Sequence, residues 1–140
     1  MSGTFLAARL LFALLFIGSG VAHITQADAM TQYAHAKGVP QARLATVVSG
    51  VWITIGGFSV ALGVWGDAGA LMLTAFLVPA TFMMTNFWAA QDPIAKQTEQ
   101  VMFMKNIALC GGGLAIFVMF ATLGDTLGLT ITGSAFELRP

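Results

Sequence analysis

The chain has 140 residues, of which 57% are hydrophobic and only 9% are charged, with six acidic and six basic side chains. Soluble domains carry about 25% charged residues, so this composition favours a membrane protein, formed by one domain over residues 1–140. A net charge of zero without a basic tract argues against nucleic-acid binding. The single cysteine, Cys110, excludes an intrachain disulfide, and the spacing of His23 and His35 does not suit a metal site, so we expect none.

Four apolar runs are long enough to cross a bilayer, which takes about 20 helical residues. They cover residues 5–24, 44–65, 69–90 and 101–123, and they predict an all-α membrane protein with an antiparallel bundle of four transmembrane helices. The first run, in which Arg9 is the only charge, also has the form of a signal peptide. Because Gly20-Val21-Ala22-His23 lacks a clear cleavage site, we expect a retained helix instead.

The first connection, residues 25–43, has the signals of a short helix. Asp28 is suited to its first turn, and Gly38 followed by Pro40 stops it after Lys37. We interpret this segment as an interfacial helix on the membrane surface, with an ordered loop as the alternative.

The remaining connections are polar. Gly66-Asp67-Ala68-Gly69 is a tight turn, so the second and third spans must be antiparallel neighbours. Residues 91–100 are interpreted as the second polar connection. The tail, residues 124–140, either folds back on the bundle or stays loose.

Small residues recur along the first two spans. Gly18 and Ala22 lie four residues apart in the first span, and Ser49, Gly56 and Gly63 recur every seven residues in the second. Such residues let neighbouring helices approach closely, so we interpret both sets as packing positions and not as ligand contacts.

Several motifs together resemble a known family. They are the segment from Arg9 to Gly20, Lys37-Gly38-Val39-Pro40, Phe87-Trp88, and the segment from Phe103 to Gly112. In order and spacing they resemble the DoxX family of small bacterial four-helix membrane proteins, over residues 5–123. The resemblance implies a multi-pass protein of the bacterial cytoplasmic (inner) membrane. The matching positions are Arg9, Phe16, Gly20, Gly38, Pro40, Lys105, Asn106 and Gly111.

The resemblance also implies a class of function, because the family is similar to membrane subunits of an archaeal thiosulfate:quinone oxidoreductase. It implies an integral membrane subunit of a quinone-linked oxidoreductase or respiratory-type complex, which helps to bind quinone or a redox partner. The chain's own side chains would hold no cofactor, and its partners would be the lipid bilayer and a larger membrane complex. The alternative is a non-catalytic accessory or assembly subunit; a small-solute permease is less favoured because four short helices leave little room for a central site.

Polar side chains gather where the fourth span begins. A charged side chain near hydrocarbon is costly in free energy, so its presence there indicates a functional role. Glu99 and Asn106 lie seven residues apart and so share a helix face with Lys105 nearby. His23 ends the first helix on the same side, whereas Arg9 lies near the opposite surface. We predict a ligand- or partner-binding cluster there, with an interfacial salt bridge and snorkelling cations as the alternative. Its members are His23, Glu99, Lys105 and Asn106, joined by Asn86 and Trp88.

Overall fold

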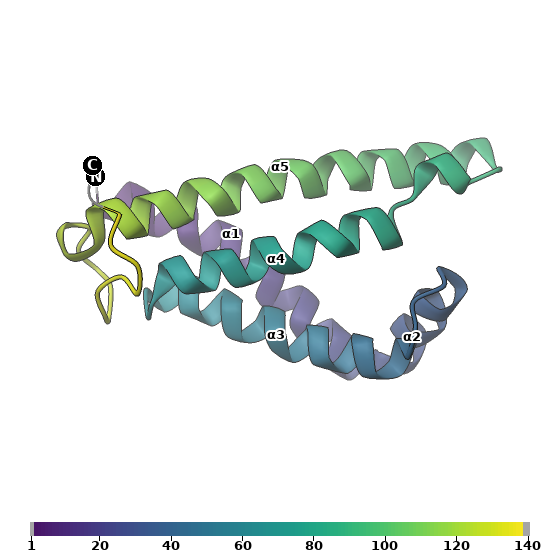
Figure 1. Cartoon of the computed structure of the whole chain (residues 1–140), viewed down its shortest axis with the longest axis horizontal. Coiled ribbons are helices and arrows are strands. Elements are labelled where there is room, and N and C mark those ends of the chain that lie inside the picture. Colours follow the sequence, from purple (N-terminus) through teal and green to yellow (C-terminus); the bar gives the residue numbers. More distant parts are fainter. Residues whose placement is uncertain (1, 139–140) are drawn as a thin grey trace.

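The computed structural model describes residues 2–138. All regular secondary structure in this range is helical, and it contains no strand. The α-helices are α1 (Ser2–Thr25), α2 (Ala27–Ala36), α3 (Ala42–Leu62), α4 (Gly66–Met84) and α5 (Pro93–Leu123). Two short 3-10 helices follow α4 and α5, namely η1 (Phe87–Ala89) and η2 (Gly124–Thr126). Within this described range, four helical segments are long and apolar enough to cross a membrane. The predicted antiparallel four-helix bundle, with a short helix between its first two spans, is confirmed (Figure 1).

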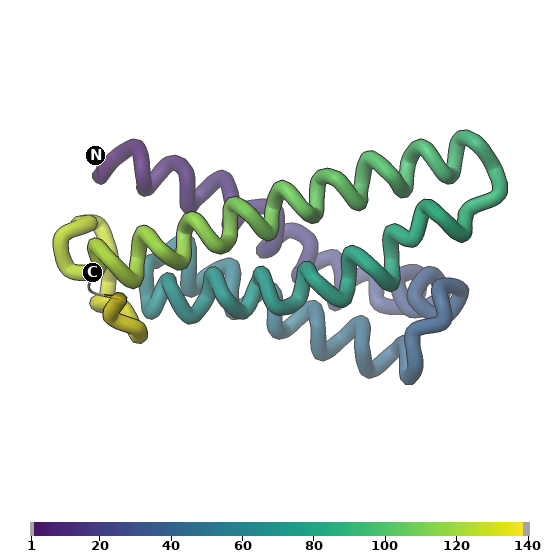
Figure 2. The backbone as a smooth tube through the Cα atoms, turned by 45° about the horizontal axis from the view of Figure 1, so that its top comes forward, coloured from purple at the N-terminus to yellow at the C-terminus, as the bar shows by residue number. Residues whose placement is uncertain are grey.

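The two ends of the bundle differ. The first and last parts of the chain lie together at one end, here named the termini end, whereas α2, η1 and the start of α5 lie at the other, the loop end (Figures 1 and 2). α1 packs on α3, α3 on α4, and α4 on α5. The start of α1 contacts the end of α5 through Phe5 and Phe120, whose ring centres are 5.2 Å apart, and α1 lies away from α5 at the loop end (Figure 1).

Glycines set how closely α1 and α3 approach. At Gly20 of α1, an added Cβ would overlap the hydroxyl of Thr54 and lie 2.9 Å from the carbonyl oxygen of Gly50. At Gly57 of α3, it would lie 2.7 Å from a side-chain carbon of Ile17. A larger residue at these positions would therefore force the two helices apart.

The expected small-residue contacts are confirmed only in part. Gly56 is buried against α4, where an added Cβ would lie 2.9 Å from Leu73. The expectation for Gly18 is wrong, because this glycine is exposed and has no atom of another residue within reach. The helix buries the face that carries Gly20, which lies about 200° around the helix from Gly18.

Several helix boundaries differ from the predicted spans. The turn predicted at residues 66–69 is wrong, because these residues form the first turn of α4, and residues 63–65 join α3 to α4. α5 begins at Pro93 and not near residue 101, because the Asp92 carboxylate accepts a hydrogen bond from the Ala95 N–H (2.9 Å) and proline suits a first turn. The second polar connection is therefore mostly helix. α4 ends at Met84, before the predicted residue 90.

The tail folds back across the termini end, where it is held by a buried carboxylate. Asp67 is fully buried in the first turn of α4, and its two oxygens accept hydrogen bonds from the backbone N–H groups of Ala135 (2.9 Å) and Phe136 (2.5 Å). Backbone bonds from Ile131 to Leu62 and from Thr132 to Gly63 fix the tail against the α3–α4 turn. Asp67 thus has a structural role that the turn interpretation missed.

Arg9 is buried at the same end. Its side chain is 2% exposed, and its guanidinium lies 5.9 Å from the ring centre of Phe5 and 5.8 Å from that of Phe120. The Nη2 atom donates a hydrogen bond to the Leu129 carbonyl oxygen of the tail. The snorkelling interpretation is therefore wrong for Arg9, whose guanidinium is buried against two aromatic rings and has one backbone acceptor. Its Nε and Nη1 atoms are buried without a hydrogen-bond partner in residues 2–138.

We expect Gly20→Ala to destabilise the protein by about 1–3 kcal/mol, because the added methyl group overlaps α3 and must push the helices apart. Thermal unfolding in detergent measures the effect. The matched control is Gly18→Ala on the same helix, which adds the same methyl group into open space and should leave stability equal or slightly higher. Equal losses in the two variants would contradict the packing described above.

We expect Asp67→Ala to release the tail and to lower stability by about 1–3 kcal/mol, since two hydrogen bonds to a charged acceptor are lost. Hydrogen exchange at the Ala135 and Phe136 amides should accelerate. Asp28→Ala, which removes an exposed carboxylate of α2 at the loop end, is the control and should change neither measurement. Unchanged exchange in Asp67→Ala would show that the tail is held by other contacts.

Candidate functional site

A cavity of about 620 Å³ lies among the helices at the loop end. Its volume falls within the range of about 300–1,000 Å³ that is usual for small-molecule sites. The walls are mostly apolar and come from all five α-helices. The apolar lining includes Leu15, Phe16, Met30, Phe76, Leu77, Met83 and Leu109, and the polar lining includes Ser19, His23, Thr46, Ser49, Lys105 and Asn106.

His23 is held by its own helix and by a glycine of α3. Its Nδ1 lies 2.7 Å from the Ser19 carbonyl oxygen, and because that oxygen only accepts, Nδ1 must carry the hydrogen. Gly50 leaves room for the side chain, since an added Cβ there would lie 2.7 Å from the Cβ of His23. The ring meets Phe76 edge to face, at 6.3 Å between centres. Its second nitrogen, Nε2, makes no hydrogen bond within residues 2–138.

Lys105 and Asn106 are adjacent on α5 and face His23 from the other side of the bundle. Within residues 2–138 the Lys105 ammonium has a single polar partner, the Met102 sulfur (3.5 Å), which is a weak acceptor, and the side chain is exposed. Asn106 is half-buried, and its carboxamide makes no hydrogen bond within residues 2–138. Both side chains therefore have donor groups available to a molecule in the cavity.

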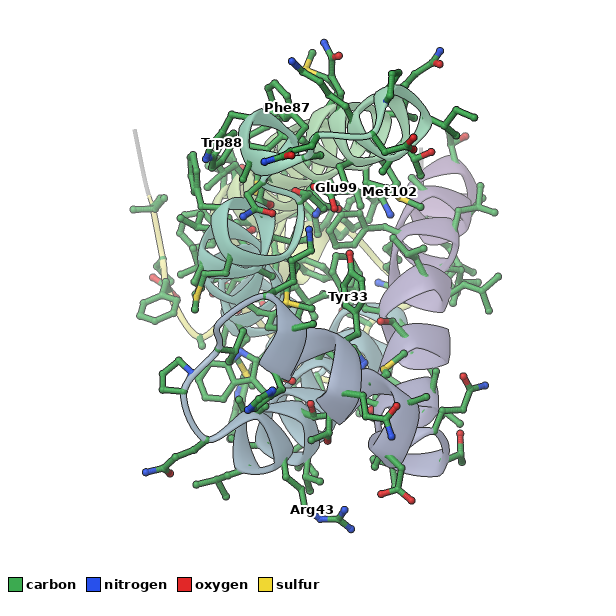
Figure 3. The ribbon with its side chains drawn as sticks, turned by 90° about the vertical axis from the view of Figure 1, so that its right-hand side faces the viewer. Tyr33, Arg43, Phe87, Trp88, Glu99 and Met102 are labelled. Atoms are coloured by element: carbon green, nitrogen blue, oxygen red, sulfur yellow. The ribbon has the colours of Figure 1, made fainter. Side chains whose placement is uncertain are left out.

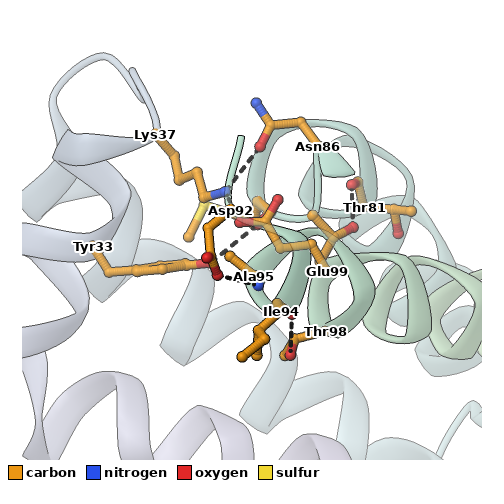
Figure 4. Close-up of polar contacts among 11 residues, drawn as sticks. Tyr33, Lys37, Thr81, Asn86, Asp92, Ile94, Ala95, Thr98 and Glu99 are labelled. Carbon is orange, nitrogen blue, oxygen red and sulfur yellow. Dashed lines mark hydrogen bonds and ion pairs between the residues drawn. The ribbon is translucent and has the colours of Figure 1, made fainter. Parts of the chain in front are cut away.

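A second polar cluster joins α2 to the α4–α5 end. Lys37, the C-cap of α2, donates to the Asn86 side-chain oxygen (2.9 Å) and forms an ion pair with Glu99 (Figure 4). Only 16% of the Lys37 side chain and 17% of the Glu99 side chain are exposed. Tyr33 points from α2 toward α4 and donates to the Met84 carbonyl oxygen (3.3 Å; Figures 3 and 4).

The structure divides the predicted site residues into two groups. His23, Lys105 and Asn106 line the cavity together. Glu99 and Asn86 instead meet at Lys37, so the expected proximity of Glu99 to Lys105 is wrong. These two residues are six apart, which places them roughly 120° apart around α5. The binding role of all these residues stays a prediction.

Trp88 lies apart from both groups. Its side chain is 55% exposed and meets Phe87 and Phe103 edge to face, at 5.3 and 6.0 Å between ring centres. Figure 3 shows it at the outer side of the loop end. An exposed indole at this level suits the interface between hydrocarbon and head groups.

Sequence reasoning missed Lys37 and Tyr33 as members of a polar cluster. Lys37 was interpreted as the end of a helix and as part of a family motif, although a lysine beside Gly38 is also well placed to reach a carboxylate on another segment. The hydroxyls of Thr46 and Ser49, which line the cavity, were also missed. Their signal is weak, because hydroxyls in membrane helices commonly bond their own backbone, as Ser49 does to Thr46 (3.0 Å).

Comparison with known proteins places the chain among membrane proteins. The family model described as DoxX matches residues 4–86. The inner membrane protein YqjF of Escherichia coli (strain K12) is 32% identical to the chain over 117 residues, which cover 81% of each protein. The comparison with solved structures found no match. The family match includes His23, Lys37 and Asn86, whereas Glu99, Lys105 and Asn106 lie beyond it.

Proposed function

Because the chain belongs to the DoxX family and is a multi-pass inner membrane protein, we propose that it binds a membrane quinone in its loop-end cavity. In this proposal it serves as the membrane subunit of a quinone-linked oxidoreductase or respiratory-type complex. The observation that supports it is one apolar cavity of about 620 Å³ in which His23, Lys105 and Asn106 meet.

The chemistry of a quinone head group suits this lining. It is a flat apolar ring with an oxygen at each end, and the cavity offers aromatic and aliphatic walls, including Phe16 and Phe76. The Lys105 ammonium and the Asn106 carboxamide are donors to one oxygen. On the opposite wall, His23 Nε2 accepts from a hydroxyl when neutral or donates to a carbonyl when protonated. His23 is thus the group that holds or passes a proton.

Electrons must come from elsewhere in this proposal. We place the redox centre on a partner protein, and this chain contributes binding, orientation and the proton at His23. The α-helices around the cavity also separate the head group from water, which strengthens each hydrogen bond to it.

An accessory or assembly subunit is the second candidate, favoured by the start of α5. This segment is helical yet lies beyond the apolar run, and Ile94 there is 76% exposed beside the exposed Lys96. An exposed apolar side chain in a polar setting suits a protein partner. Purification from the native membrane discriminates the two: a partner with haem, flavin or iron–sulfur supports the first, and a complex whose activity survives deletion of this chain supports the second.

The quinone proposal predicts labelling of the cavity by an azido-substituted short-chain ubiquinone. In nanodiscs, cross-linked peptides should come from α1, α4 and α5 around His23, Phe76 and Asn106, and excess decylubiquinone should suppress them. Removing a charged donor to the quinone oxygen should weaken binding about tenfold or more. Lys105→Met should therefore need a correspondingly higher probe concentration to reach the same extent of labelling. Asn106→Leu should act in the same direction.

Lys96→Met is the matched control, because it removes a lysine of the same helix that does not line the cavity. Its labelling should equal that of the unchanged protein. Cross-links outside the cavity, or equal labelling of Lys105→Met and Lys96→Met, would refute the quinone site.

A further inference from the structure

One face of α2 forms a wall of the cavity. Ala29, Met30, Tyr33 and Ala34 all line it, and they come from successive turns of the same helix. α2 lies across the loop end, where α1 and α3 are separated from α4 and α5 (Figures 1 and 3). The helix therefore covers the cavity on the side that faces the aqueous phase.

Packing holds α2 only weakly. Of the ten residues of α2, only Ala34 is buried. The helix follows α1 after the single residue Gln26 and is joined to α3 by residues 37–41, in which Gly38 and Gln41 have positive φ. Elements with few buried apolar contacts open at low free-energy cost. Polar contacts from α2 to the rest of the bundle therefore matter more than usual.

Those polar contacts cross the gap between the two helix pairs. Lys37 binds Asn86 and Glu99, and Tyr33 binds the end of α4. The second Glu99 oxygen, Oε2, is buried without a hydrogen-bond partner in residues 2–138. Loss of Lys37 would leave this carboxylate mostly buried and uncompensated, so the open state has to admit water to it.

We propose that α2 is a lid over the cavity and that the Lys37–Glu99 ion pair is its latch. Breaking the pair frees the end of α2 from the α4–α5 end, and the helix swings about Gly38 and Gln26 to connect the cavity with the aqueous phase. The inference rests on the proposed function only in treating the cavity as a binding site. It adds a route of access and a control point for that site.

The test measures the access of water-soluble reagents to the cavity and contains no quinone, so its failure and the failure of the quinone proposal are distinguishable. Ser49→Cys, placed in a Cys110→Ser background, reports from the cavity wall. A cationic and an anionic methanethiosulfonate are both used, because a latch variant also changes the local charge. Lys96→Cys, exposed at the loop end, reports reagent delivery alone and should react equally in every variant.

We expect Lys37→Met and Glu99→Gln to raise the rate of modification at position 49 about fivefold or more with both reagents, which corresponds to ~1 kcal/mol of latch free energy. The exchange of charges in Lys37→Glu with Glu99→Lys should restore a slow rate. Tyr33→Phe removes only the hydroxyl that donates a hydrogen bond to the Met84 carbonyl oxygen, and it should raise the rate less. This variant is the substitute test if Lys37→Met does not fold.

Arg43→Met is the matched control. It breaks an ion pair between α3 and Asp28 of α2 (2.8 Å), but both partners are exposed and neither lines the cavity. Arg43 lies at the outer edge of the loop end (Figure 3). Its rate should equal that of the unchanged protein. Unchanged rates in Lys37→Met and Glu99→Gln, an equal rise in Arg43→Met, or no recovery in the charge exchange would each overturn the latch.

Discussion

The positions of the glycines decide where neighbouring helices come into close contact, and the rest of the structure depends on these positions. The glycines of α4, Gly66 and Gly69, both lie in its first turn at the termini end, where they receive Phe120 of α5 and Ser59 of α3. The loop half of α4 carries bulky side chains instead. α4 is therefore drawn close to its neighbours along its termini half, as far as Leu73 and Thr74, which pack on Gly56 of α3 and Gly113 of α5.

α1 follows α3 by the same rule. Gly57 and Gly50 of α3 allow contact from the middle of the bundle to His23 near the loop end. Two helix pairs, α1 with α3 and α4 with α5, consequently separate toward the loop end, and the space between them is the cavity. The positions of the small residues thus account for both the tight end and the hollow end of one bundle.

Charge is used differently at the two ends. At the termini end, Asp67 and Arg9 are buried and bind the backbone of the tail, so their charges stabilise structure. In the cavity, Lys105 and Asn106 have no strong partner within residues 2–138. Keeping a charged or polar group without a partner at a membrane-embedded cavity costs free energy. Such a group is therefore a candidate for binding a ligand.

The sequence was sufficient to predict the architecture, because each apolar run of bilayer length directly indicates a membrane-spanning helix. It was less informative where a helix leaves the hydrocarbon: residues 93–100 are polar, and hydropathy does not distinguish a polar helix from a polar loop. The cap at Asp92 and Pro93 carries that information instead. The antiparallel order of the four spans correctly separated Arg9 from the loop end, because that inference needed only the end of the bundle at which each helix begins.

Side-chain partners were harder to predict, because they depend on how helices cross. Lys37 and Glu99 are 62 residues apart, and neither position shows that α2 lies against the start of α5. The same holds for Asp67, whose partners in the tail are 68 and 69 residues away. Local spacing along one helix, as for Glu99 and Asn106, indicates a shared face but does not indicate what that face meets.

The tail has a consequence for the order in which the protein is assembled. During synthesis residues 129–136 emerge after α5, so Arg9 and Asp67 enter the membrane long before their backbone partners exist. Until then, the termini end of the bundle contains one cation and one carboxylate without these bonds. Docking of the tail therefore follows the insertion of α1 and α4, and it is the step that supplies both buried charges with their backbone partners.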